Sequence, residues 1–473
     1  MKFSVKLMVQ TVTVATALLL TNMLQAAPAF QFPAYEKVQL ENGLTIYLLE
    51  QHEVPLMTVN VTVKAGAILD NKAGLANLTA QSLMLGAGNQ SKAQVAQTVD
   101  FLGANLNVAG DLEASVLQTT FMAKDRDTML NLVQATLLKP AFASADFAKL
   151  KQRHLAALEN ARQSPRDVIE PYFRRLNYGT HPYGNAVEGD INSVKQISLE
   201  DVKAFYQANY QPAQTAIAVV GDFDSKQMKK QLNGLFANWK NTGSVDKNVA
   251  QAKLPAVPSA AKQAEVLLVN KSDAIETTFM IGGPGVAQDN PDYVGISVIN
   301  TVLGGRFTSW LNDELRVNSG LTYGARSAFS RFGESGLFAI STFTAKENTQ
   351  AALDLAMKTY QRLWQQGLDQ ATLDSAKAYV KGQFPPRFET NAALAGLLGD
   401  MYVYGFNEDY INSFQQKVDN LTLAESKRLI DLYFPQQNLK FVLIGQAQTV
   451  APIAAKFGKV TQVDIQANGF AAK

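Results

Sequence analysis

The chain contains no cysteine and only three histidines among its 473 residues. No disulfide, cysteine nucleophile or thiolate metal site can therefore form. The histidines (His52, His154 and His181) do not pair at a spacing that suits a metal, and we expect them to be surface or turn residues. The formal charge is nearly balanced, at +2, so it gives no indication of a nucleic-acid partner or an electrostatic membrane anchor.

Long apolar runs are also missing. Outside the N-terminus, no stretch approaches the about 20 consecutive apolar residues that a membrane-spanning helix needs. Residues 1–29 have the pattern of a secretory signal peptide: two lysines, a short apolar stretch at 12–20, and small residues that allow cleavage after Ala26 or Ala29. The alternative is an uncleaved membrane anchor, which the short, threonine-interrupted run disfavours. We expect a soluble mature protein in the periplasm of a Gram-negative bacterium.

The mature chain contains an internal repeat. Ser198 and Thr422, 224 residues apart, each begin a hydroxyl-x-x-acid pattern typical of a helix cap. Each is followed by an amphipathic helix, a proline, an apolar strand and a glycine 23 residues after the cap. A Leu-Gly pair also recurs, at 85–86 and 303–304, with a spacing of 218 residues. Two repeated patterns at nearly the same spacing indicate a duplicated domain.

Residues 246–263 carry proline, lysine and small residues, which is typical of a linker. We therefore predict a first domain at 30–245 and a second at 264–473. Alternating apolar residues around an Asn-Gly turn at 38–49 predict a β-hairpin. Strand and helix patterns mix throughout both halves. The predicted fold class is α+β, with two duplicated domains that each pack helices on a mostly antiparallel sheet.

Several short phrases occur in a specific order along the chain. They are Val63-Lys-Ala-Gly66, Gly74-Leu-Ala76, His181-Pro-Tyr-Gly184, Gly189-Asp190, Asn209-Tyr210-x-Pro212, Val219-Val-Gly-Asp222, Leu303-Gly-Gly305, Glu314-Leu-Arg316 and Gly320-Leu-Thr-Tyr323. In this order and spacing the chain resembles the M16 (pitrilysin/insulinase-like) zinc peptidases of the bacterial two-domain type. The resemblance covers about residues 35–470 and implies the M16 metallopeptidase fold.

The family's zinc-binding motif aligns with a segment of this chain that lacks the zinc-binding residues. Members of the family carry H-x-x-E-H after the Gly-Leu-Ala phrase, with two histidines that bind zinc and a glutamate that activates water. Here the three positions are Asn77, Ala80 and Gln81. The family's third ligand, a glutamate on a later helix, falls at Glu159 or, one residue later, at Asn160. One carboxylate without two imidazoles cannot hold catalytic zinc tightly, so we interpret Glu159 as a solvated helix-face charge and expect no metal or other cofactor in this chain.

A second family motif is present. In active members the second domain contributes an arginine and a tyrosine to the substrate site, and here these are Arg316 and Tyr323. Arginine offers a rigid fork of donors for a peptide carbonyl or carboxylate, and a tyrosine hydroxyl can stabilise an oxyanion. The structural alternative is an arginine that caps its own helix with a tyrosine packed beneath it.

Together the two motifs indicate that zinc and the Arg/Tyr pair come from two different subunits. We expect the non-catalytic subunit of a heterodimeric periplasmic peptidase, whose sister subunit supplies H-x-x-E-H and Zn²⁺ while Arg316 and Tyr323 act in trans on peptide substrates. The alternative is a peptide-binding or scaffold protein on the same fold with no proteolytic partner, since sheet edges can bind extended peptides. An active hydrolase with another chemistry would need a nucleophile and base that the sequence does not show.

Overall fold

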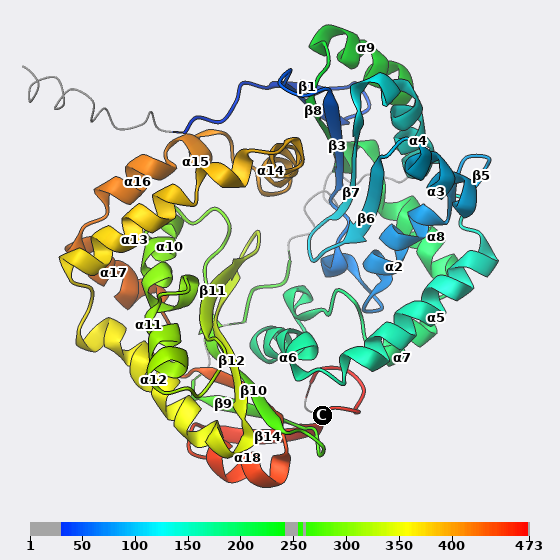
Figure 1. The fold of residues 1–473 in the computed structure, drawn as a ribbon. Helices are drawn as coiled ribbons and strands as arrows, with labels where there is room; N and C mark the ends of the chain where they lie inside the picture. The colour runs from blue at the N-terminus through cyan, green and yellow to red at the C-terminus, as the bar shows by residue number, and fades with distance from the viewer. Residues whose placement is uncertain (1–29, 242–253, 259–261, 472–473) are drawn as a thin grey trace, which may run out of the picture.

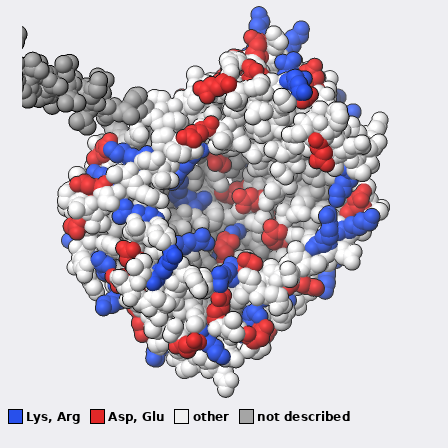
Figure 2. All heavy atoms as spheres, viewed as in Figure 1, with Lys and Arg blue, Asp and Glu red and all other residues white. Residues whose placement is uncertain are grey.

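The computed structural model describes residues 30–241, 254–258 and 262–471. Two α+β halves face each other around a central hollow, which the space-filling view also shows (Figures 1 and 2). The predicted signal peptide and much of the predicted linker lie outside the described residues. Within those residues, no helix is long and apolar enough to cross a membrane.

Each half is built on a six-stranded sheet. The first sheet has the order β1 (Glu36–Gln39), β2 (Thr45–Glu50), β8 (Thr215–Gly221), β3 (Leu56–Val63), β7 (Ser115–Met122) and β6 (Asn105–Gly110). The second has the order β11 (Arg326–Arg331), β12 (Gly336–Ala345), β10 (Glu276–Pro284), β13 (Lys440–Gly445), β9 (Glu265–Asn270) and β14 (Lys459–Asp464). A two-stranded ribbon pairs β4 (Gly86–Ala87) with β5 (Gln90–Ser91).

The strand order confirms the duplication. Read from opposite ends, β2-β8-β3-β7-β6 of the first sheet matches β9-β13-β10-β12-β11 of the second. The pairings match as well, since β2–β8 and β9–β13 are parallel and the remaining matched pairs are antiparallel. The copies differ at one edge, where β1 runs antiparallel to β2 and β14 runs parallel to β9. The predicted α+β class with mostly antiparallel sheets is confirmed.

Helices surround both sheets, most of them on the outer faces (Figure 1). Those of the first half are α2 (Leu75–Ser82), α3 (Lys92–Phe101), α4 (Arg126–Leu138), α5 (Ser144–Ala161), α6 (Pro165–Tyr178), α7 (Ile191–Gln196), α8 (Leu199–Asn209) and α9 (Ser225–Phe236). Those of the second half are α10 (Tyr293–Asn300), α11 (Trp310–Asn312), α12 (Thr349–Gln365), α13 (Gln370–Gly382), α14 (Asn391–Tyr404), α15 (Asp409–Asn412), α16 (Phe414–Asn420), α17 (Leu423–Tyr433) and α18 (Ala447–Ala454). Two π-helical segments, η7 (Thr301–Gly305) and η8 (Asp313–Asn318), flank α11.

The two halves exchange one helix each across the hollow. Helix α14 of the second half packs on the inner face of the first sheet, and a Cβ at Gly399 would lie 2.5 Å from Thr62 Oγ1 of β3. Helix α6 of the first half packs on the inner face of the second sheet, where Ile169 and Phe173 share one buried cluster with Met280. Each half therefore completes the core of the other, and the inner sheet faces are only partly covered.

The local patterns read from the sequence formed largely as expected. The hairpin at 38–49 is present as β1 and β2. Ser198 caps α8, as predicted. Its hydroxyl oxygen accepts from the Asp201 backbone N–H, and the Asp201 carboxylate accepts from the Ser198 backbone N–H. Thr422 caps α17, but the expected reciprocal contact is replaced, because the Glu425 carboxylate pairs with Arg428 instead.

Candidate functional site

Helix α2 carries the positions of the missing zinc motif, and a carboxylate holds its first turn. The two oxygens of Asp70 accept hydrogen bonds from the backbone N–H groups of Gly74, at 2.8 Å, and Ala76, at 2.7 Å. Gly74 has a φ of +93°, a left-handed conformation that favours glycine. Burial raises the pKa of Asp70 to about 7, against the opposing effect of these backbone hydrogen bonds.

The amides that replace the zinc ligands bond to each other. Gln81 Nε2 donates to Asn77 Oδ1 at 3.1 Å, one helical turn away. Asn77 is only 3% exposed, and its Nδ2 donates to Glu188 Oε2 at 3.0 Å. The same Glu188 oxygen lies 3.7 Å from Nδ1 of His154 on α5, whose Nε2 lies 2.8 Å from the Glu188 backbone oxygen. We call Gln81, Asn77, Glu188 and His154 the amide relay.

His154 corrects one prediction. We expected surface or turn histidines, but this side chain is buried, because α5 turns Phe147, Leu150 and His154 inward along one face. His181 does lie in a turn, but it is buried as well, with Nε2 2.9 Å from the backbone oxygen of Pro255. His52 is exposed between Glu50 and Asp222, and hydrogen bonds to Asp222 and then Glu50 raise its pKa.

The donor set at α2 does not fit zinc. Both amides are engaged in hydrogen bonds, and Ala80 is fully buried and offers no donor atom. Glu159 is exposed on α5, away from the face that carries His154. Within the described residues, no group of three or more histidine, cysteine, aspartate or glutamate side chains could hold a metal ion. A zinc ion needs three or four such donors, which the side chains at these positions of α2 do not provide.

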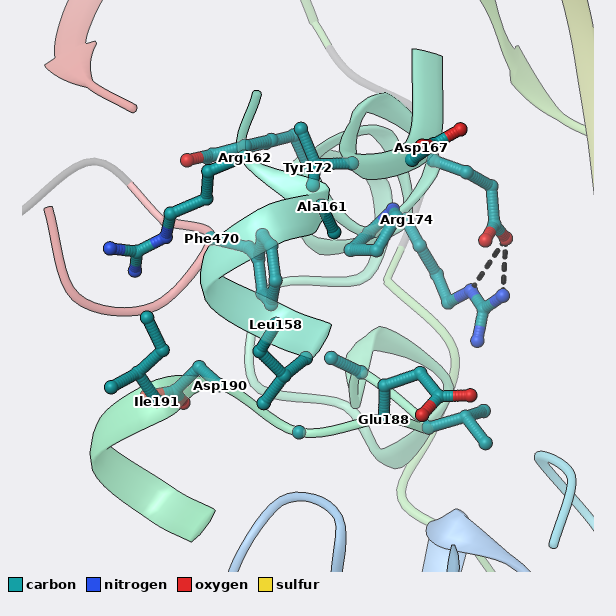
Figure 3. A pocket seen from close by; sticks show the side chains of 16 residues that line it. Leu158, Ala161, Arg162, Asp167, Tyr172, Arg174, Glu188, Asp190, Ile191 and Phe470 are labelled. Carbon is teal, nitrogen blue, oxygen red and sulfur yellow. Dashed lines mark hydrogen bonds and ion pairs between the residues drawn. The ribbon is translucent and has the colours of Figure 1, made fainter. Parts of the chain in front are cut away.

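A pocket of about 180 Å³ adjoins the amide relay (Figure 3). Leu158 and Ile191 form part of its apolar wall, and Glu188 lies at its edge. The C-terminal tail closes one side, since the Phe470 ring packs edge-on against Tyr172 at 5.0 Å between centroids. The relay therefore borders a small apolar pocket rather than a cluster of metal-binding side chains.

In the second half, a π-helical segment presents Arg316. Such segments are rare and often occur at functional sites. The segment ends at Asn318, and Gly320, with a φ of +63°, turns the chain just after it, before Tyr323. The Arg316 guanidinium lies 4.6 Å from the centroid of the Phe307 ring, and the Phe307 side chain is 63% exposed. No carboxylate pairs with Arg316 within the described residues.

Tyr323 projects from the surface at 85% exposure. Its ring stacks on Phe343, with centroids 6.3 Å apart and an interplanar angle of 22°. The centroid of the Phe343 ring lies 3.4 Å from the guanidinium carbon of Arg166 on α6. Arg166 also forms an ion pair with Glu276 at 2.9 Å. Tyr323 therefore does not pack beneath Arg316, whereas Arg316 does lie in the last turn of its own π-helical segment, as the structural alternative expects.

The structure brings together some predicted residues and separates others. Asn77 and Gln81 meet in the relay, whereas Arg316 and Tyr323 lie in the other half, with no hydrogen bond or ion pair to the relay in the described part of the chain. Sequence reasoning missed Glu188 and Arg166. Glu188 directly precedes the Gly-Asp phrase of the resemblance, but nothing in the sequence indicates its contact with α2.

Comparison with solved structures defines the class of fold. A peptidase M16 inactive domain from Pseudomonas fluorescens superposes with a TM-score of 0.79 and 26% identity, over 87% of this chain and 98% of that one. A protease from Helicobacter pylori superposes with a TM-score of 0.77 and 21% identity, over 88% of this chain and all of that one.

Family models make the identification specific. The model for Insulinase (Peptidase family M16) matches residues 45–191, and the model for the Peptidase M16 inactive domain matches residues 196–380. The chain belongs to peptidase family M16. A non-peptidase homolog from Helicobacter pylori is 24% identical over 84% of this chain and 90% of its own length. An uncharacterized zinc protease from Rickettsia bellii is 22% identical over 78% of this chain and 87% of its own length.

Proposed function

We propose that this chain is the non-catalytic subunit of a heterodimeric periplasmic M16 peptidase. A sister subunit carries H-x-x-E-H and Zn²⁺, and this chain contributes peptide binding. The observation that supports this proposal most is the contrast between the two halves. The zinc positions are closed by the amide relay, whereas Arg316 lacks an acidic partner in the described residues and Tyr323 is 85% exposed.

The chemistry of the pair fits a role in trans. The Arg316 guanidinium lies 4.6 Å from the centroid of the Phe307 ring, and its donor fork can bind a peptide carbonyl or carboxylate. The Tyr323 hydroxyl can donate a hydrogen bond to an oxyanion that forms at a neighbouring reaction centre. Such donors stabilise the transition state more than the ground state, so their loss lowers kcat more than it raises KM.

Co-purification of the mature chain with an H-x-x-E-H sister encoded next to it tests the proposal. Cleavage of a fluorogenic peptide library by the complex should fall by about 10²-fold or more in the double variant Arg316→Ala, Tyr323→Phe. Arg153→Ala, an exposed arginine on α5, serves as the control and should leave the rate unchanged. Equal cleavage by the wild-type and doubly substituted complexes would contradict the role in trans.

The alternative, a peptide-binding scaffold with no proteolytic partner, has one structural feature in its favour. Strand β6 is an edge strand that pairs with β7 alone, so its outer backbone groups can accept an extended peptide. Peptide binding by the lone chain, together with the lack of any sister that converts it to a peptidase, would favour this reading.

A further inference from the structure

A second, larger cavity lies across α6 from the amide relay. It has a volume of about 440 Å³ and opens between α6 and the inner face of the second sheet. The exchanged helix α6 packs on this sheet face through Ile169 and Phe173, and the cavity lies beside it, lined by Arg166 and Ile169 of α6 and by residues of the sheet. The cavity is therefore a direct consequence of the helix exchange.

Strand register places the lining side chains on one face. Thr278 of β10 pairs with Phe343 of β12, and Met280 pairs with Ser341, which pairs in turn with Arg326 of β11. Directly paired residues of antiparallel strands project to the same side of the sheet. All five side chains line the cavity, and Ile169 and Arg166 face them from α6.

One lining side chain has an unmet hydrogen bond. Thr278 is 4% exposed, and its Oγ1 is fully buried with no hydrogen-bond partner in the described part of the protein. A buried hydroxyl without a partner carries a free-energy cost, because it loses the hydrogen bonds that it makes with water in the unfolded chain, and such groups are uncommon in folded proteins. A ligand that brings a polar atom to Thr278 would remove this cost.

The charges around the cavity do not balance. Arg166 is paired with Glu276, and Glu170 is paired with Arg174. Arg326 is exposed and donates only to Ser341 Oγ, at 3.2 Å, so its guanidinium has no carboxylate partner among the described residues. The cavity mouth therefore carries one unneutralised positive charge, which favours an anionic group on the ligand.

We propose that this cavity is a side-chain subsite that binds a tyrosine of a peptide whose neighbouring residue carries a carboxylate. The tyrosine ring packs among Ile169, Met280 and Phe343. Because Thr278 Oγ1 is buried, the threonine side chain rotates about χ1 to bring this oxygen to the tyrosine hydroxyl. The carboxylate, from an acidic side chain or from the peptide's own C-terminus, pairs with Arg326. Tyr323 stacks on Phe343 at the same place, so the subsite extends the peptide-binding surface of the proposed function and rests on it.

Fluorescence anisotropy with labelled seven-residue peptides tests the subsite, using the mature chain alone and in complex with its sister. Three amidated peptides contain Tyr-Asp, Phe-Asp or Tyr-Asn, and a fourth peptide ends in Tyr with a free carboxylate. The Tyr-Asp peptide should bind about three- to tenfold tighter than Phe-Asp, the effect of one hydrogen bond. Preference for Tyr-Asp over Tyr-Asn, or for the free terminus, distinguishes the two sources of carboxylate.

Two variants localise the effect. Thr278→Val keeps the side-chain shape and should reduce the tyrosine-to-phenylalanine affinity ratio to about one. Arg326→Gln should weaken the carboxylate peptides about three- to tenfold and leave Tyr-Asn unchanged. Equal binding of the tyrosine and phenylalanine peptides by the wild-type chain, or an unchanged ratio in Thr278→Val, would overturn the subsite alone. No binding of any peptide by the chain or the complex would overturn the proposed function with it.

Discussion

The side-chain amide of Asn77 donates a hydrogen bond to the carboxylate of Glu188 at 3.0 Å, at a position where the family resemblance predicts a zinc ligand. The carboxylate also approaches His154 on α5, so the contact joins α2, α5 and the segment before α7. The loss of the motif has therefore left a hydrogen-bonded structural element and not a void.

Replacement of Asn77 by alanine should destabilise the first half. The substitution removes the donor to Glu188 and the acceptor of Gln81, and we expect a loss of about 1–2 kcal/mol in the free energy of unfolding. Urea denaturation monitored by circular dichroism measures this change. Asn160→Ala, an exposed residue of the same type on α5, should change the stability by less than about 0.5 kcal/mol. Equal effects of the two substitutions would show that the relay contributes nothing to stability.

Metal analysis of the purified mature chain should find well under about 0.2 zinc per chain, because two amides and one carboxylate form no tight zinc site. Inductively coupled plasma mass spectrometry after dialysis against zinc-containing and then metal-free buffer gives this ratio. A value near one zinc per chain would contradict the interpretation of α2.

Two glycines of α14 should respond in opposite directions to alanine. A Cβ at Gly399 would displace the buried Asn60–Thr62 hydrogen bond on β3, and we expect Gly399→Ala to cost about 1–3 kcal/mol. Gly396, one turn earlier, has no atom within 4 Å of such a Cβ. Gly396→Ala should therefore stabilise the protein by up to about 1 kcal/mol through helix propensity. Thermal melting of both variants tests whether α14 packs on the first sheet, and a similar loss in both would contradict this packing.

Asp70, whose carboxylate accepts hydrogen bonds from the start of α2, should make the stability of the protein depend on pH. Burial raises the pKa of Asp70 to about 7, whereas in the unfolded chain it is near 4, so the folded chain holds this proton more tightly. The contribution of Asp70 to stability is largest below about pH 4 and is lost as the pH rises to about 7. Asp70→Asn, which cannot ionise, should show a smaller fall in melting temperature between pH 5 and pH 7.5 than the wild type. Asp431→Asn, an exposed carboxylate on α17, is the control and should follow the wild-type curve.

The sequence predicted much of the fold because the relevant patterns are local. Alternating residues around an Asn-Gly turn specify the β1–β2 hairpin, and a Ser-x-x-Asp phrase specifies the start of α8. The repeat of such phrases at one offset revealed the duplication. The failure at His154 has the opposite origin, since a helical pattern does not say which neighbouring element will cover a given face.

The sequence by itself determined that the zinc positions lack imidazoles, that the chain is two copies of one domain, and that Arg316 and Tyr323 remain. Only the tertiary structure decided that Asn77 bonds to Glu188, that α6 and α14 exchange between the halves, and that a cavity remains beside Thr278. The physical reason is the range of the interactions. Residue type and helix or strand period are fixed within a few residues, whereas these contacts join segments more than one hundred residues apart, and packing of the whole chain decides them.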